Sequence, residues 1–254
     1  MRTDETLHDD FEGETAPLVL ENVGKSFGKT TVLEDISFRL PANSVTAVIG
    51  PNGSGKSTLS RIVTGLSQPS TGEVTLQTTT ERPVGYLPQD PQFRPVFTVE
   101  ETIRFYSDLL TSSEDPMSII KQVGLNDVSG RRIDALSGGM RRLVGIAQSF
   151  LGSPPVIVLD EPTSGLDPRM TEQIFDIVAA RAEKGASVFL TTHDLNYATE
   201  ADFLIVLHRG EIVAKGSPNQ LLAQTESKSL SDAFLSLVGR EPTVQTGHLE
   251  TTNE

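Results

Sequence analysis

The segment from residue 50 to residue 58 has the residue types and the spacing that can hold a phosphate group. It consists of Gly50, Pro51, Asn52, Gly53, Ser54, Gly55, Lys56, Ser57 and Thr58. Glycines at this spacing let successive backbone N–H groups curl around an anion at the N-terminus of a following helix. Lys56 would then reach the β- and γ-phosphates of a nucleotide, and the Ser57 hydroxyl would be a ligand of Mg²⁺. The segment therefore predicts a phosphate-binding loop.

The flanking sequence predicts the strand and the helix that such a loop needs. Residues 45–49 (VTAVI) are apolar and β-branched, which is typical of a short strand. The apolar residues after the loop recur at the spacing of one helix face, at Leu59, Ile62, Val63 and Leu66. A glycine-rich turn after a core strand is the alternative interpretation. The order of strand, loop and helix favours the phosphate loop.

Two adjacent carboxylates follow a second apolar run. Residues 156–159 (VIVL) suit a central parallel strand, and Asp160 and Glu161 come directly after it. Asp160 fits a water-mediated partner of Mg²⁺, and Glu161 fits a group that orients or deprotonates an attacking water molecule. A solvated strand end is the alternative, which the nearby phosphate loop disfavours.

Three further positions carry weaker signals. His193 follows a predicted strand at 187–191 and could sense a γ-phosphate, although a lone histidine is more often a cap or a surface residue. The Ser137-Gly138-Gly139 segment precedes a predicted helix and could bind an anion, although taken alone it is better explained as a plain N-cap. Phe27 lies at a turn before the loop and could stack on a purine ring or pack in the core.

The remaining pattern predicts an α/β protein. Residues 18–40 read as an antiparallel sheet, and 72–76 and 84–87 as further strands. Between Gln89 and Ser137 the pattern changes to a compact helical insertion, with a capping box at Thr98 and a second helix at 116–123. The rest of the chain predicts a helix from Pro168, a hairpin of 203–207 with 211–214, a helix from about Pro218 and one more over 227–239.

Composition sets limits on the class of protein. The chain has 254 residues, no cysteine and a formal net charge of −13, so we expect one main domain, no thiolate metal site and no nucleic-acid binding. No apolar run approaches the roughly 20 residues that span a bilayer. Residues 1–16 hold six Asp or Glu and one Arg, which predicts a flexible acidic tail, and the other end is similar.

Taken together, the motifs resemble the nucleotide-binding subunit of an ATP-binding cassette (ABC) transporter. The resemblance rests on the phosphate loop, Gln89, the signature Leu136 to Gly139, Asp160-Glu161, the turn Ser164 to Asp167, and His193, all in the order of the family. It implies a P-loop NTPase (RecA-like) ABC core with an antiparallel β subdomain and an inserted α-helical subdomain. We expect the nucleotide-binding domain at 17–222, its helical subdomain at about 90–153, and a C-terminal helix and flexible tail at 223–254.

The resemblance also implies roles for the motif residues. Two subunits would pair head to tail, so that Ser137, Gly138 and Gly139 of one close over the ATP bound to the loop of the other. Phe27 would stack on adenine, and Ser57, Gln89 and Asp160 would hold Mg²⁺. The catalytic set would be Glu161, His193, Lys56 and Gln89. Gln89 would also link this site to a membrane partner.

Met140 separates two branches of the family. The commonest signature has Gln at this position, and Met is similar to the branch that exports drugs, polysaccharides and lipids, often as a homodimer beneath a separate membrane subunit. The expected protein is therefore an ATPase of an exporter, at the cytoplasmic face of a membrane and held there by an integral permease. An ABC importer subunit and a soluble ABC-type ATPase of cluster assembly are the alternatives.

Overall fold

The computed structural model describes residues 16–78, 80–110 and 115–239. Nearly all of the two predicted flexible tails lies outside this part of the chain, and the predicted domain boundaries stay predictions. Within the described residues no helix has both the length and the apolar character needed to cross a bilayer.

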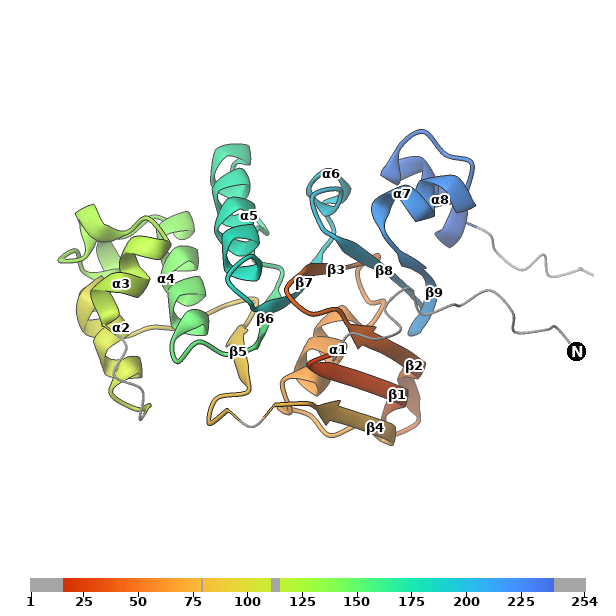
Figure 1. The fold of residues 1–254 in the computed structure, drawn as a ribbon, viewed down its shortest axis with the longest axis horizontal. Coiled ribbons are helices and arrows are strands. Elements are labelled where there is room, and N and C mark those ends of the chain that lie inside the picture. The colour runs from red at the N-terminus through yellow and green to blue at the C-terminus, as the bar shows by residue number, and fades with distance from the viewer. Residues whose placement is uncertain (1–15, 79, 111–114, 240–254) are drawn as a thin grey trace, which may run out of the picture.

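A six-stranded sheet forms the centre of the molecule (Figure 1). Its strand order is β5-β6-β7-β3-β8-β9, in which the first five strands run parallel and β9 pairs antiparallel with β8. The bounds are β3 Val45–Ile49, β5 Val84–Leu87, β6 Val156–Asp160, β7 Ser187–Thr192, β8 Phe203–His208 and β9 Glu211–Gly216. Every residue of β3, β6 and β7 is buried, because both faces of these strands are covered. The predicted strands at these positions are confirmed.

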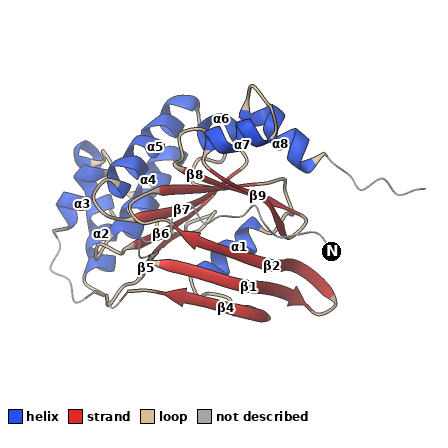
Figure 2. Cartoon of the chain, turned by 45° about the vertical axis from the view of Figure 1, so that its right-hand side comes forward, coloured by secondary structure: helices blue, strands red, loops and turns tan. Residues whose placement is uncertain are grey.

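A separate antiparallel sheet has the order β2-β1-β4. Its strands are β1 Leu18–Phe27, β2 Thr30–Leu40 and β4 Thr71–Leu76. Figure 2 shows helix α1 (Lys56–Val63) between this sheet and the central one. One apolar cluster joins Leu33 and Ile36 of β2 to Leu59 of α1 and Val158 of β6. The antiparallel sheet therefore fixes the position of the helix that follows the loop.

The prediction that Leu66 lies on the buried face of α1 is wrong. The helix ends at Val63, and the chain then turns through Gly65, whose φ of 73° favours glycine. The turn leaves the Leu66 side chain 67% exposed.

Three helices form the inserted segment at one end of the central sheet (Figure 1). They are α2 Val99–Ser107, α3 Pro116–Gln122 and α4 Gly138–Phe150, with short 3₁₀ turns at Asn126–Val128 and Ile133–Ala135. Gly145 of α4 lies so close to β5 that a Cβ atom there would overlap the Leu87 side chain. Leu110 lies beyond the end of α2 and still packs against the main apolar core.

The C-terminal helices cover the face of the central sheet that is opposite α1 (Figure 2). These are α5 Pro168–Ala182, α6 Leu195–Ala198, α7 Pro218–Gln224 and α8 Leu230–Val238. The helices predicted from Pro168, from Pro218 and within 227–239 are confirmed. α6 is a short turn that follows His193, and it was not predicted.

We expect the capping box of α2 to contribute measurably to stability. The Thr98 hydroxyl accepts from Glu101 N, and the Glu101 carboxylate accepts from Thr98 N. Thr98→Ala should lower the free energy of unfolding by about 0.5–2 kcal/mol in urea titrations, because the backbone N–H of Glu101 loses its acceptor. Thr98→Ser keeps the hydroxyl and should stay close to the parent. Equal midpoints for all three proteins would show that the box is not stabilising.

Candidate nucleotide-binding site

The loop from Gly50 to Gly55 connects β3 to α1 and needs its glycines. Gly53 has a φ of 81° and Gly55 a φ of 108°, a region that other residues rarely enter. A Cβ atom on Gly55 would lie 2.6 Å from the Leu33 side chain of β2. Gly55 is also the N-cap of α1 and supplies no side-chain hydrogen bond. The first N–H groups of this helix are therefore left for an anion.

Lys56 is the first residue of α1, and its side chain reaches back into the loop. Its side chain is only 6% exposed, and Nζ donates to the carbonyl oxygens of Gly50 at 2.8 Å and Pro51 at 3.2 Å. Nζ also lies 3.7 Å from Oε1 of Glu161. The loop and the end of β6 thus place one cation and one carboxylate side by side.

Asp160 and Ser57 meet at the carboxyl ends of the parallel strands. The Ser57 hydroxyl lies 3.3 Å from Asp160 Oδ1, which also accepts from the Thr191 hydroxyl at 2.7 Å. The same Thr191 oxygen accepts from the backbone N–H of Glu161 at 2.9 Å. Thr191 therefore holds both acidic residues through one hydroxyl group.

Glu161 adopts an unusual backbone conformation and a well-defined side-chain position. Its φ of 51° lies in the left-handed region, which costs a residue other than glycine about 1–2 kcal/mol. Its Oε2 atom lies 2.6 Å from Nδ1 of His193, and its side chain is 9% exposed. The His193 side chain is 56% exposed. The carboxylate is thus held between a buried lysine and a histidine open to solvent.

Lys56, Ser57 and Glu161 line a hollow of about 300 Å³. It is lined by Val32, Asn52, Gly53, Gly55, Lys56, Ser57, Thr58, Gln89 and Glu161. Free helix N–H groups and a lysine suit the phosphates of a nucleotide, and oxygen atoms of Ser57, Gln89 and Asp160 suit Mg²⁺. Among the described residues no cluster of three or more His, Cys, Asp or Glu could hold a metal alone. The donor set therefore fits a magnesium ion shared with phosphate oxygens and water.

Nearby carboxylates affect the pKa of one guanidinium and one phenol, those of Arg142 and Tyr86. Burial lowers the pKa of Arg142 on α4, and Asp90, Asp160 and Glu161 oppose this effect. Burial raises the pKa of Tyr86 on β5, and the negative charge of Asp160 adds to the rise. Both groups lie within the electrostatic reach of Asp160.

Several predicted groups do not line this hollow. Asp160 and His193 are absent from its lining but contact the lining residues Ser57 and Glu161. Ser137, Gly138 and Gly139 begin α4, where the Ser137 hydroxyl accepts from Met140 N at 3.2 Å, and none of the three lines the hollow. Phe27 is 56% exposed and does not line it either. Packing of Phe27 in the core is therefore wrong, and stacking on a base stays a prediction. Lys25 Nζ lies 5.1 Å from the centre of the Phe27 ring.

Two residues of this site lie outside the sequence motifs. Thr191 ends a predicted strand, and its contact with Asp160 follows from the parallel pairing of Asp160 with Thr191 in neighbouring strands. Val32 comes from the antiparallel sheet, and no sequence signal connects it to the loop.

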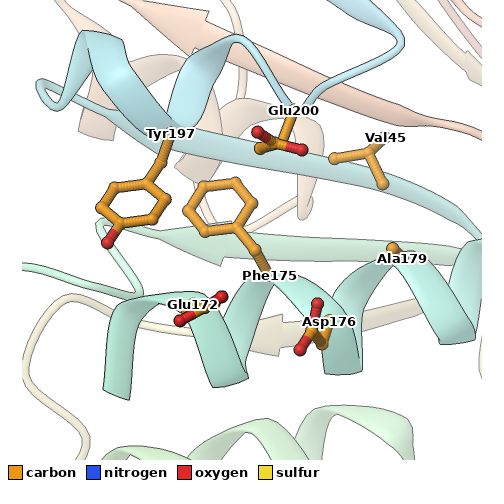
Figure 3. A pocket seen from close by; sticks show the side chains of 7 residues that line it. All are labelled: Val45, Glu172, Phe175, Asp176, Ala179, Tyr197 and Glu200. Carbon is orange, nitrogen blue, oxygen red and sulfur yellow. The ribbon is translucent and has the colours of Figure 1, made fainter. Parts of the chain in front are cut away.

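A second, larger hollow of about 400 Å³ lies between α5 and α6 (Figure 3). Figure 3 shows three carboxylates around it, from Glu172, Asp176 and Glu200, beside the stacked rings of Phe175 and Tyr197. Three negative charges would repel a triphosphate. The smaller hollow at the loop is therefore the better nucleotide site.

Comparison with known proteins agrees with this geometry. A sequence model of the family described as "ABC transporter" matches residues 33–164, slightly more than half of the chain. The Lantibiotic transport ATP-binding protein SrtF of Streptococcus pyogenes is 30% identical over 203 residues, covering 77% of this chain and 89% of the relative. The Nod factor export ATP-binding protein I of Rhizobium johnstonii is 31% identical over 232 residues, covering 85% of this chain and 75% of the relative.

Other relatives differ in length or are known by structure. ABC transporter G family member 20 of Dictyostelium discoideum is 30% identical, but the chain spans only 32% of its length. A solved ATP-binding subunit of an ABC transporter has a TM-score of 0.77 at 28% identity, covering 87% of this chain and 98% of that one. The cassette MJ0796, a dimer bound to ADP and phosphate, has a TM-score of 0.70 at 26% identity, covering 79% of this chain and 98% of that one. The chain belongs to the ABC transporter family, and its fold is that of the family's ATP-binding subunits.

Proposed function

We propose that two copies of this chain hydrolyse ATP at shared sites and drive export through a separate membrane subunit. The observation that carries the proposal is the position of the Glu161 carboxylate, between Lys56 and His193 at the mouth of the phosphate loop. A carboxylate held in this way has the chemistry of a general base for water.

Binding of the nucleotide would use the loop as it stands. The N–H groups at the start of α1 and the Lys56 ammonium would hold the phosphates, and Lys56 would exchange its bonds to Gly50 and Pro51 for phosphate oxygens. Ser57, Gln89 and Asp160 would hold Mg²⁺, which neutralises charge on the transferring phosphate when bound. We infer that Phe27 stacks on the adenine ring after a local adjustment.

Hydrolysis would depend on Glu161 and His193. Glu161 would accept a proton from the attacking water molecule, whose direction its carboxylate fixes. Nδ1 of His193 contacts this carboxylate, so only Nε2 of the ring is left for a γ-phosphate oxygen. The two side chains would therefore orient the water and the phosphate toward each other.

Pairing of two copies would complete each site. Ser137, Gly138 and Gly139 lie at the N-terminus of α4 and are absent from the lining of the hollow of their own chain. The dimeric MJ0796 cassette shows that relatives of this fold pair. In a head-to-tail pair this segment would contact the nucleotide of the other copy, and both halves of the site are present in one chain.

Export is the direction that the relatives favour. One relative is named for Nod factor export and another for lantibiotic transport. Met140, at the Gln position of the common signature, points the same way and packs half-buried against the main core. We infer a place at the cytoplasmic face of a membrane, on an integral permease.

The helical segment carries an apolar surface suited to that permease. We define the helical patch as Val96, Phe105 and Leu109, which are 62%, 38% and 68% exposed. The rings of Phe97 and Tyr106 meet Phe105 edge to face, and Arg94 lies 5.0 Å from its centre. Leu109 is exposed, as an apolar partner surface requires, whereas Tyr106 and Phe97 are half-buried. A group of exposed apolar side chains beside the Gln89 loop fits a protein partner.

Glu161→Gln tests the proposed base. The amide keeps the shape of the side chain but cannot accept the proton, so steady-state ATPase activity should fall by roughly 10²–10⁴. ATP should still bind, and the fraction of dimer with ATP and Mg²⁺ should rise in size-exclusion chromatography. Activity within threefold of the parent would rule Glu161 out as the base, and an unchanged monomer would argue against pairing of two copies.

Thr191→Val tests the support of the acidic pair. Valine has the same shape but no hydroxyl, so Asp160 and the Glu161 N–H each lose a hydrogen bond. The Mg²⁺ concentration for half-maximal ATPase activity should rise about 10- to 100-fold, the range for partners that orient metal ligands. Thr46→Val is the matched control, since the fully buried Thr46 hydroxyl has no partner among the described residues. Equal Mg²⁺ dependence in both variants would refute the role of Thr191.

Leu109→Glu tests the helical patch. A charge at the centre of an apolar interface is costly, so recovery of a multi-span membrane protein from native membranes should fall at least about fivefold, with ATPase activity unchanged. Leu66→Glu is the control, because Leu66 is equally exposed at 67% but lies after α1. If both variants lose the membrane protein, or if neither does, the helical patch is not the docking surface. Recovery of no membrane protein by the parent would favour the cluster-assembly alternative.

A further inference from the structure

Arg142 connects the helical segment to the loop after β5. It lies three residues after Gly139 on α4, and its Nη1 atom donates to the carbonyl oxygen of Gln89 at 2.6 Å. The same atom lies 3.5 Å from the carbonyl oxygen of Pro88. These carbonyls belong to the two peptide planes that meet at the Cα atom of Gln89. Because each plane is rigid, holding both fixes the direction in which the Gln89 side chain leaves the backbone.

The packing of α4 makes this contact possible. Gly145 lies one helical turn beyond Arg142, on the same side of α4. A Cβ atom on Gly145 would overlap the Leu87 side chain and lie 3.5 Å from Pro91. The missing side chain therefore lets the helix lie directly against the chain on both sides of Gln89.

The charges around Arg142 keep its guanidinium in this place. It is half-buried, and burial lowers its pKa, while Asp90, Asp160 and Glu161 favour the charged form. Arginine stays protonated in proteins even under such burial. The cation thus lies in the field of the two carboxylates proposed for magnesium binding and catalysis. Nη1 alone contacts both carbonyl oxygens, and the rigid, planar guanidinium holds this atom in place, whereas the ammonium of lysine ends a flexible stem.

We propose that Arg142 is a positioning residue that ties α4 to the Gln89 side chain. This inference rests on the proposed function, in which Gln89 binds magnesium in its own chain and the start of α4 contacts the nucleotide of the other copy. When α4 closes on the nucleotide of the other copy, it would then fix the direction of the Gln89 side chain at the nucleotide of its own chain. The two sites of the pair would be linked through one arginine and two carbonyl groups.

A double-mutant cycle tests this role. The full-length parent, Arg142→Gln, Gln89→Ala and the double variant are compared for Mn²⁺ affinity in the ATP-loaded protein, by electron paramagnetic resonance at 4 °C, and for ATPase activity. Arg142→Gln should weaken Mn²⁺ binding about 10- to 100-fold, the range for groups that orient metal ligands. ATP binding in EDTA should stay within about twofold of the parent. In the Gln89→Ala background Arg142→Gln should add less than about twofold, because it acts only through Gln89.

Two further variants separate positioning from charge and from folding. Arg142→Lys keeps the charge but replaces the rigid guanidinium with an ammonium on a flexible stem, so it should remain defective in Mn²⁺ binding. Arg104→Gln is the control, since Arg104 lies on the neighbouring helix α2 and contacts only the exposed Glu100 among the described residues. It should behave as the parent in all measurements.

The outcomes distinguish this inference from the proposed function. Full Mn²⁺ affinity in Arg142→Gln, or independent and multiplicative effects of Arg142→Gln and Gln89→Ala, would overturn the positioning role. A parent that binds no ATP would overturn the proposed function as well. Normal ATP and Mn²⁺ binding that depends on Gln89 but not on Arg142 would overturn this inference alone.

Discussion

The parallel register of β3, β7 and β6 is the constraint on which the site depends. Asp160 pairs with Thr191 across one strand boundary, and Ile49 pairs with Thr192 across the next. This register places the start of the phosphate loop and the two carboxylates at the same edge of the sheet. A slip of one residue would turn the Asp160 side chain to the opposite face and break its bond to Thr191. The fully buried strands resist such a slip, because each would lose its apolar contacts on both faces.

The two sheets together determine the shape of the loop. Helix α1 lies between them and shares one apolar cluster with both. Gly55 touches Leu33 of the antiparallel sheet, and Val32 of the same strand lines the hollow. Gly210, in the turn between β8 and β9, donates to the carbonyl of Ser54 within the loop. The antiparallel sheet and the β8-β9 hairpin thus help to shape the candidate nucleotide site.

The chemistry is divided between two bodies of structure. The loop and the central sheet present Lys56 and Glu161 at one hollow, with Asp160 behind the lining residue Ser57, while the inserted helices carry Ser137 to Gly139 apart from it. Gln89 lies between them, since it lines the hollow and its carbonyl is held by α4. An arrangement of this kind suits a protein in which ligand binding at the hollow has to move the inserted helices. It also explains why one chain holds all the expected groups but not all of them at one hollow.

The sequence by itself determined the local elements and the types of the reactive groups. The glycine spacing of the loop requires positive φ angles, the capping box at Thr98 begins a helix by its own hydrogen bonds, and continuous apolar runs require buried strands. These features depend on neighbours in the chain, so periodicity and residue type predict them. The error at Leu66 arose because helix periodicity continues past a glycine that ends the helix.

Only the tertiary structure decided which distant groups meet. Thr191 bridges Asp160 and Glu161 because two parallel strands, far apart in the sequence, share one register. Val32 reaches the hollow, and Arg142 reaches the Gln89 carbonyl, because α1 and α4 pack closely against their sheets. The positive φ of Glu161 and the exposure of Phe27 likewise result from packing across elements. Such contacts depend on long-range packing and strand order, and residue type and local spacing do not encode these.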